Sequence, residues 1–347
     1  MSSVFGNNIK VSIFGESHGT AIGAVIDGLP AGEEIDGDEL AAFMARRAPG
    51  NALTTPRKES DTPEFMSGIY KGKTTGAPVC VIIGNTNVRS EDYKKINNIP
   101  RPGHADYTAR IKYSGNADMR GGGHFSGRLT APLCAAGGIA LQVLKRRGII
   151  INAHIVSIGG LENITEENVK KLIESLDGDS VGGIIECSAV GLPAGLSAGA
   201  GGIFGLESAL SAAIFGIPAV KGVEFGSGFE GSRKKGSENN DAFVIKDGSV
   251  VTATNNHGGL LGGITTGMPL VFRAAFKPTP SIALEQDSID LVTLESVKLK
   301  IEGRHDPCIV MRAAPVVEAV TALVLLDTMH GSPERKQYGF TTNQKRN

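Results

Sequence analysis

The pattern of apolar and polar residues along this chain alternates between short β-branched runs and longer runs with helical periodicity. The short runs predict strands over Ile9–Phe14, Ile22–Ile26, Ala77–Ile83, Ile149–Ile158, Gly183–Val190, Val220–Phe225, Ala242–Ile245 and Leu270–Phe276. The longer runs predict helices over Asp38–Ala48, Thr130–Arg147, Thr165–Leu176, Gly205–Phe215 and Pro315–Met329, with Asp38 and Thr165 as N-caps. Two segments without either period, Asn51–Phe65 and Thr86–Asp118, are predicted to be loops.

One short sequence occurs twice. Gly28-Leu-Pro-Ala-Gly32 recurs as Gly191-Leu-Pro-Ala-Gly195, and each copy follows a predicted strand and precedes a predicted helix. This indicates a duplicated strand–turn–helix unit with pseudo-two-fold symmetry. We therefore expect one fused domain over residues 1–347 rather than two independent ones, with a disordered polar tail over residues 337–347.

The composition is that of an ordinary globular protein. Of the 347 residues, 41% are hydrophobic and 20% are charged, and the net charge is −1. With so little net charge, no overall electrostatic field favours nucleic acid or a membrane, and we expect neither as a partner. The four cysteines are far apart and form no CxxC, and no signal-peptide pattern is present, so we expect free thiols and a cytoplasmic protein.

Three turns place a titratable side chain beside glycine or proline, where it is better placed to reach a ligand than to fill a core. They are Gly15–Gly19 with His18, Arg101–Asp106 with His104, and Arg304–Cys308 with Asp306. Because they are spread over the whole chain, we expect one site assembled from distant segments. His154 lies within a predicted strand and is interpreted as structural, whereas His257 and His305 are expected to support the site.

Basic residues gather near these turns and near glycine-rich segments. Arg46, Arg47, Arg57, Arg101, Arg110, Arg120, Arg128 and Arg304 all lie in or beside such places. Arginine suits phosphate and carboxylate groups, so the ligand is predicted to be a small polyanion. The segments Gly121–Arg128, Asn255–Gly263 and Lys277–Ser281 are rich in hydrogen-bond donors and would suit a substrate together with a phosphorylated cofactor.

Familiar nucleotide and metal motifs are absent from the sequence. Gly72-Lys73-Thr74 resembles the end of a P-loop, but Ser67 stands where the motif needs glycine. No GxGxxG follows a strand, and no HExxH or GxSxG occurs. The histidines are too scattered for a convincing metal site, so we expect none.

Several long motifs resemble those of chorismate synthases, in the order of that family and over essentially the whole chain. They are residues 15–30 (GESHGTAIGAVIDGLP), 101–106 (RPGHAD), 121–130 (GGGHFSGRLT), 255–267 (NNHGGLLGGITTG), 277–281 (KPTPS) and 304–308 (RHDPC). The resemblance implies an α+β fold, a β-α-β sandwich with an internal pseudo-two-fold repeat, assembled as a homotetramer. It implies elimination of phosphate and the C6 hydrogen from 5-enolpyruvylshikimate-3-phosphate to give chorismate. It also implies that reduced FMN is required, without net redox change.

The resemblance also implies roles for individual residues. His18 would protonate or stabilise the reduced flavin, His104 would act as an acid near the substrate phosphate, and Asp306 would assist removal of the C6 proton. FMN would be held by His124, Phe125, Ser126, Ala219, Gly262, Lys277, Pro278, Thr279, Pro280, Ser281 and Arg304. Arg47, Arg101 and Arg128 would bind the anionic groups of the substrate.

The chain departs from the family pattern in places. Ala48 stands where many members carry a third arginine, the stretch Asn51–Leu53 lacks another, and His124 and Gly127 replace frequent arginine and alanine. The missing arginines contact substrate or nicotinamide in relatives, and the sequence does not identify what replaces them. Two alternative functions are an NAD(P)H-dependent flavin reductase and a non-catalytic flavin- or anion-binding protein.

Overall fold

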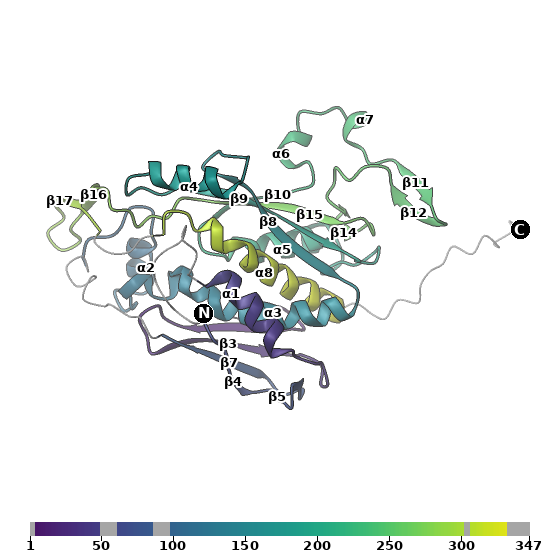
Figure 1. The fold of residues 1–347 in the computed structure, drawn as a ribbon, viewed down its shortest axis with the longest axis horizontal. Helices are drawn as coiled ribbons and strands as arrows, with labels where there is room; N and C mark the ends of the chain where they lie inside the picture. Colours follow the sequence, from purple (N-terminus) through teal and green to yellow (C-terminus); the bar gives the residue numbers. More distant parts are fainter. Residues whose placement is uncertain (1–3, 49–60, 86–97, 302–305, 332–347) are drawn as a thin grey trace, which may run out of the picture.

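Two antiparallel sheets enclose a layer of helices (Figure 1). The computed structural model describes residues 4–48, 61–85, 98–301 and 306–331. The first sheet has the order β1 (Val4–Phe5), β2 (Lys10–Gly15), β3 (Ala21–Asp27), β7 (Val79–Gly84), β4 (Glu64–Ser67). The second has the order β10 (Val220–Phe225), β15 (Leu270–Phe276), β9 (Gly183–Val190), β8 (Ile150–Ile158). Between the sheets lie α1 (Gly37–Arg47), α3 (Thr130–Arg146), α5 (Leu206–Phe215) and α8 (Val310–His330).

The remaining elements are short and lie around this sandwich. The short helices are α2 (Asp106–Lys112), η2 (Arg120–Phe125), η3 (Gly127–Leu129), α4 (Glu166–Ser175), η4 (Gly202–Phe204), α6 (Gly228–Gly231) and α7 (Gly236–Asn239). The short strands are β5 (Ile69–Tyr70), β6 (Lys73–Thr74), β11 (Phe243–Lys246), β12 (Ser249–Thr252), β13 (Leu260–Leu261), β14 (Ile264–Thr265), β16 (Gln286–Ile289) and β17 (Ser296–Leu299).

The expected internal repeat is present. The first sheet contains the run β2-β3-β7-β4, and the second contains the equivalent run β8-β9-β15-β10, with α3 following β7 and α8 following β15. The repeated five-residue turn is held identically in both halves. Thr74 donates from its hydroxyl to the Pro30 carbonyl at 2.5 Å, and Thr265 donates to the Pro193 carbonyl at 2.6 Å. The β-α-β sandwich with pseudo-two-fold symmetry is thus confirmed.

Small residues allow the central helices to approach closely. A Cβ on Gly137 of α3 would overlap Ala319 of α8, and a Cβ on Gly138 would lie 2.5 Å from the Leu40 side chain of α1. The two glycines therefore face two different helices, which explains the pair that the sequence places inside an apolar helix. Buried side chains from both sheets and all four central helices form one continuous apolar core.

One segment, Gly127–Arg146, is long and apolar enough to cross a membrane by length and composition. However, 83% of this apolar stretch is buried inside the protein, because α3 lies between the two sheets. Its apolar character is accounted for by the core that it helps to form.

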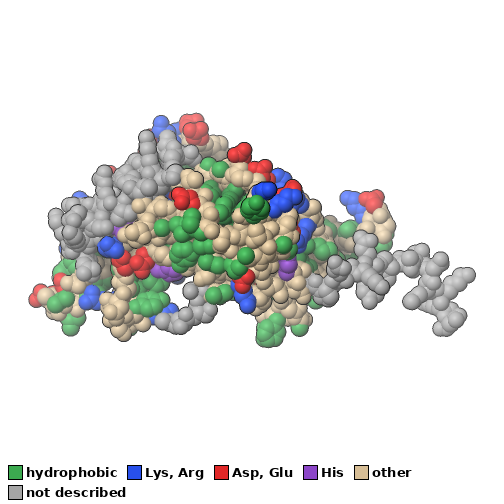
Figure 2. Space-filling model, turned by 90° about the horizontal axis from the view of Figure 1, so that it is seen from below, with side chains coloured by type: hydrophobic (Ala, Val, Ile, Leu, Met, Phe, Trp, Pro, Cys, Tyr) green, Lys and Arg blue, Asp and Glu red, His purple; other side chains and the backbone are tan. Residues whose placement is uncertain are grey.

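The outer face of the first sheet carries exposed apolar side chains. Val4 of β1 and Met66 of β4 are each more than half exposed, as is Tyr70 of β5, which follows β4 in the chain. Seen from below the view of Figure 1, hydrophobic side chains gather on this face between charged ones (Figure 2). Such a surface is typical of a contact with another protein surface.

Several predicted boundaries were wrong. Helix α1 is capped by Asp36, whose carboxylate accepts hydrogen bonds from the backbone of Asp38 and Glu39, so Asp38 lies inside the helix. Helix α8 begins at Val310 and contains Pro315, although proline favours a helix start. The predicted loop Asn51–Phe65 contains the start of β4, and the predicted loop Thr86–Asp118 contains α2. Both elements are too short to show a clear periodicity in the sequence. The predicted tail over residues 337–347 lies outside the described residues.

The N-terminal segment is tied to the end of α8 by one carboxylate. Asp327 accepts backbone hydrogen bonds from Asn8 at 2.6 Å and Ile9 at 2.8 Å, and from Asn7 at 3.1 Å. Ile9 is fully buried beside β2. This carboxylate therefore fixes the first strands of the sandwich against its central helix.

We expect Asp327→Asn to lower the free energy of unfolding by about 3 kcal/mol, because a neutral amide oxygen accepts the buried backbone hydrogen bonds more weakly than a carboxylate does and the new NH2 group would face other donors. Melting followed by circular dichroism would measure this. Asp287→Asn is the control, since the Asp287 side chain is 87% exposed on β16. Equal melting temperatures for Asp327→Asn and the wild type would contradict this role.

Candidate active site

Two of the three predicted turns meet at the glycine run Gly121–Gly123. A Cβ on Gly121 would overlap the His18 ring, and a Cβ on Gly122 would lie 3.1 Å from His104 Nε2. Residues 121–123 all have left-handed φ angles, of 61°, 93° and 55°. Only glycine adopts such a run without strain, so the sequence of three glycines allows one backbone segment to contact both histidines.

The glycine run is anchored to the first turn. The Ser17 amide donates to the Gly123 carbonyl at 3.1 Å, and His124 Nδ1 lies 3.0 Å from the Gly15 carbonyl oxygen. Phe125 packs between His124 and Tyr113, with ring centroids 6.4 and 6.3 Å apart. Segments more than 100 residues apart in the sequence are thereby held together around His18.

His104 is oriented by its neighbours in the second turn. Its Nδ1 lies 2.6 Å from Asp106 Oδ1, and Asp106 also accepts from Arg101 Nε and Nη2, both at 2.7 Å. Burial alone would raise the pKa of Asp106, but hydrogen bonds from Arg101 and His104 outweigh it and lower that pKa. An ionised carboxylate can only accept, so Nδ1 carries a proton and Nε2 faces the glycine run.

The Lys277–Ser281 segment packs against the same turn. Lys277 Nζ donates to the Gly103 carbonyl, and Ser281 Oγ accepts from Arg101 Nη1 at 3.3 Å. Burial, and then Lys221, lower the pKa of Lys277. The Ala219 carbonyl accepts from the Lys277 amide at 2.9 Å, and Ala219 itself has a left-handed φ of 74°. These contacts place the predicted cofactor cradle beside His104.

A second charged cluster lies at the start of α3. Asp61 is almost fully buried and forms short ion pairs with both Arg47 and Arg128. Burial would raise the pKa of Asp61, but the two guanidinium groups, Arg47 first, lower it. Arg128 also donates to Asn85 Oδ1 at 3.0 Å. Because only about 5% of the Arg47 side chain and 6% of the Arg128 side chain are exposed, both are held rigidly.

Asp306 joins this second cluster through Arg312. Arg312 Nη1 lies 3.2 Å from Asp306 Oδ2, while its Nε donates to the Arg47 carbonyl at 2.9 Å. Burial and the charge of Arg47 lower the pKa of Arg312. The third predicted turn is thereby connected to the predicted substrate arginines. The Arg128 amide in turn donates to Ser126 Oγ at 3.3 Å, which connects this cluster to the glycine run.

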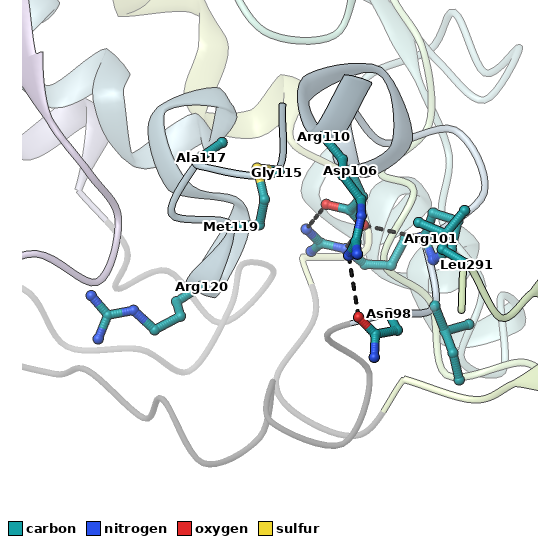
Figure 3. A pocket seen from close by; sticks show the side chains of 11 residues that line it. Asn98, Arg101, Asp106, Arg110, Gly115, Ala117, Met119, Arg120 and Leu291 are labelled. Atoms are coloured by element: carbon teal, nitrogen blue, oxygen red, sulfur yellow. Dashed lines mark hydrogen bonds and ion pairs between the residues drawn. The ribbon is translucent and has the colours of Figure 1, made fainter. Parts of the chain in front are cut away.

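A cavity of about 230 Å³ opens beside the Arg101–Asp106 turn (Figure 3). Its lining residues include Asn98, Arg101, Asp106, Arg110, Met119 and Arg120. Three guanidinium groups thus border one cavity, and Arg101 and Asp106 connect its wall to His104, as expected of a site for an anionic ligand.

Most of the predicted site residues lie in the segments that meet here. Gly262 does not, because it lies in the β13–β14 turn that precedes β15, whereas Lys277 follows β15. The seven residues of β15 span roughly 20 Å and separate the two positions. Gly262 instead accepts from the Gly202 amide at 2.8 Å. Arg304 and His305 lie outside the described residues. His154 is an exposed residue of β8, 3.9 Å from Glu186.

Sequence reasoning missed three residues that hold the site together. Asp106 follows His104 by two positions within the same turn, residues 101–106, so its role could have been inferred from the sequence. Asp61 and Arg312 carry no sequence signal, because their partners lie at distant positions in the chain. Among the described residues, no group of three or more histidine, cysteine or acidic side chains could hold a metal ion.

We expect the stability that Asp106 contributes to be lost in acid. Because its folded-state pKa is lowered, the contribution is complete above the unfolded pKa of about 4 and falls as the pH drops toward the folded value. The difference in melting temperature between the wild type and Asp106→Asn should therefore be largest near neutral pH and shrink below about pH 4. A difference that stays constant from pH 7 to pH 3 would show that this carboxylate is not the titrating group.

Known proteins share this chain's sequence and fold. The sequence profile of the family described as chorismate synthase matches residues 9–330. The chain is 46% identical to the chorismate synthase of Lancefieldella parvula, over 98% of this chain and 99% of that protein. It is 50% identical to that of Pyrococcus abyssi, over 93% and 96% respectively. A crystal structure of a chorismate synthase superposes with a TM-score of 0.72 at 27% identity, covering 93% of this chain and 92% of the other.

These matches extend over nearly the full length and include every segment that forms the site. They confirm the fold expected from the sequence motifs and the expectation of a carbon–oxygen lyase that acts on phosphate. The chain belongs to the chorismate synthase family.

Proposed function

We propose that this protein eliminates phosphate and the C6 hydrogen from 5-enolpyruvylshikimate-3-phosphate to form chorismate, a step of aromatic amino-acid biosynthesis. The observation that carries the proposal is the contact of one glycine run with both His18 and His104. Family membership identifies the reaction, and this contact supports a single site in which both histidines act. The nearby arginines suit a substrate that carries a phosphate and two carboxylates.

We propose reduced FMN as the cofactor. When bound, it supplies an electron transiently to the substrate, and the reaction has no net redox change. The Thr279 hydroxyl supports a polar ligand here: it is buried and has no hydrogen-bond partner in the described part of the chain. A buried hydroxyl without a partner is costly, and a ligand would satisfy it. The Lys277–Ser281 segment would hold the cofactor together with Ala219, His124, Phe125 and Ser126.

The residues of the chain itself have distinct roles in this proposal. His104, with its Nδ1 fixed by Asp106, presents Nε2 as an acid to the departing phosphate. His18 holds a proton beside the flavin, and Asp306, positioned by Arg312, assists removal of the C6 proton. Arg101 binds a substrate anion directly. Arg47 and Arg128 supply positive charge from a buried position that Asp61 fixes.

We further propose that the protein is a cytoplasmic homotetramer. The exposed apolar face of the first sheet supports an assembly of several copies. Because Gly262 lies beyond the far end of β15, it would contact FMN only from a neighbouring copy. Arg304 is kept as a proposed FMN contact on the family motif alone. No observation favours the alternatives, a flavin reductase using NAD(P)H or a non-catalytic binding protein.

The direct test is anaerobic turnover of 5-enolpyruvylshikimate-3-phosphate with dithionite-reduced FMN, following chorismate absorbance and phosphate release together. We expect His104→Ala and Asp306→Ala to lower kcat by about 100-fold or more, the usual contribution of acid–base groups. Binding of FMN, measured by flavin fluorescence, should be retained in both variants.

His154→Ala is the matched control, because His154 is a 63% exposed histidine on β8. It should turn over like the wild type. Wild-type kcat in either His104→Ala or Asp306→Ala would disprove the role given to that residue. Absence of product from the wild type, with substrate shown to bind, would disprove the proposed reaction.

A further inference from the structure

The cavity of about 230 Å³ beside the Arg101–Asp106 turn contains an arginine to which neither the family motifs nor the steps above give a role. Arg110 lies on α2, four residues after Asp106, so the two side chains lie on the same face of that helix. Both line the cavity, together with Arg101 and Arg120 (Figure 3).

The other two arginines of the cavity already have carboxylate partners. Arg101 forms a bidentate ion pair with Asp106, and Arg120 forms a bidentate ion pair with Asp118 at 2.5 to 3.1 Å. Their charges are therefore largely balanced within the protein. Arg101 can still donate hydrogen bonds to a substrate anion, but the net positive charge of the cavity wall must come from another group.

Arg110 is the group that supplies this charge. It donates one hydrogen bond, to the neutral Asn98 Oδ1 at 3.2 Å, and within the described ranges it forms no ion pair with a carboxylate. Its side chain is half-buried, so water reaches it only in part. A guanidinium group has five N–H donors, and most of those of Arg110 remain available on the cavity side.

We propose that Arg110 binds an oxyanion of the substrate, a carboxylate or phosphate of 5-enolpyruvylshikimate-3-phosphate. The cavity is lined by Arg101 and Asp106, the two residues that contact His104 Nδ1, so this contact would fix the substrate relative to its acid. The proposal rests on the proposed function, of which it names a specificity-determining residue. The phosphate of FMN has the same chemistry and is the competing source of the oxyanion.

The test compares Arg110→Gln with Lys112→Gln, which removes an equal charge from an exposed position on the same helix outside the cavity. We expect Arg110→Gln to raise KM for the substrate about tenfold, the usual effect of one lost hydrogen bond to a charged group, with kcat within about twofold of the wild type. Lys112→Gln should leave KM unchanged. Arg110→Lys keeps the positive charge but cannot form the bidentate hydrogen bonds of a guanidinium group, so it should give an intermediate KM. This variant also provides the test should Arg110→Gln fail to fold.

Direct binding separates this inference from the proposed function. Calorimetric titration of the substrate into wild type and Arg110→Gln should show the same tenfold loss of affinity, while the Kd of FMN stays constant. An unchanged substrate KM and Kd would overturn the inference, as would a change confined to the Kd of FMN. If the wild type does not turn over, the proposed reaction has failed, and the calorimetric comparison still decides whether Arg110 binds the substrate.

Discussion

The site depends on a stretch of backbone that has no side chains. Gly121, Gly122 and Gly123 adopt left-handed conformations in succession, with Gly121 close to His18 and Gly122 close to His104. A Cβ at Gly121 would overlap the His18 ring, and one at Gly122 would lie 3.1 Å from His104 Nε2, close enough that the ring would have to shift slightly. One backbone segment can therefore contact two histidines from distant turns only because that segment is glycine.

Buried charge fixes what the glycine run brings together. Asp106 holds Arg101 and His104, and Asp61 holds Arg47 and Arg128, so each carboxylate orients at least two basic groups. Such fully paired groups are costly to rearrange in a low-dielectric interior. The arginines are consequently preorganised before any ligand arrives, which is how electrostatic stabilisation of a developing anion is most effective. Arg110 differs, because within the described part of the chain it hydrogen-bonds to the neutral Asn98 and forms no ion pair with a carboxylate.

Much of the scaffold could be predicted from the sequence because its signals are local. The strands β9, β10 and β15 have the predicted bounds, since β-branched runs between glycine turns admit few alternatives. The repeated Gly-Leu-Pro-Ala-Gly turn correctly indicated the duplication, and the Gly137-Gly138 pair correctly indicated close helix packing. Helix α2 was missed because seven residues are too few for a clear period.

The site itself was only partly accessible to such reasoning. The histidine turns were recognisable from local composition, and family resemblance suggested roles for them. Asp61 bridges Arg47 and Arg128 only in the folded chain, because Asp61 and Arg128 lie 67 positions apart in the sequence. The same holds for Arg312, which contacts Arg47 from 265 positions away. Neither pairing leaves a trace in local periodicity, so only the folded structure identifies them.

The measurement that tests this account most directly is turnover of Gly122→Ala compared with Gly248→Ala. Both glycines have a positive φ, but a Cβ on Gly248 meets nothing within 4 Å, whereas one on Gly122 meets His104. Both substitutions therefore strain the backbone, and only Gly122→Ala also forces the His104 ring to shift, by a few tenths of an ångström. The account predicts that Gly122→Ala loses kcat by about 100-fold, the range expected for a displaced acid, while Gly248→Ala turns over like the wild type. Equal turnover by the two variants would contradict it.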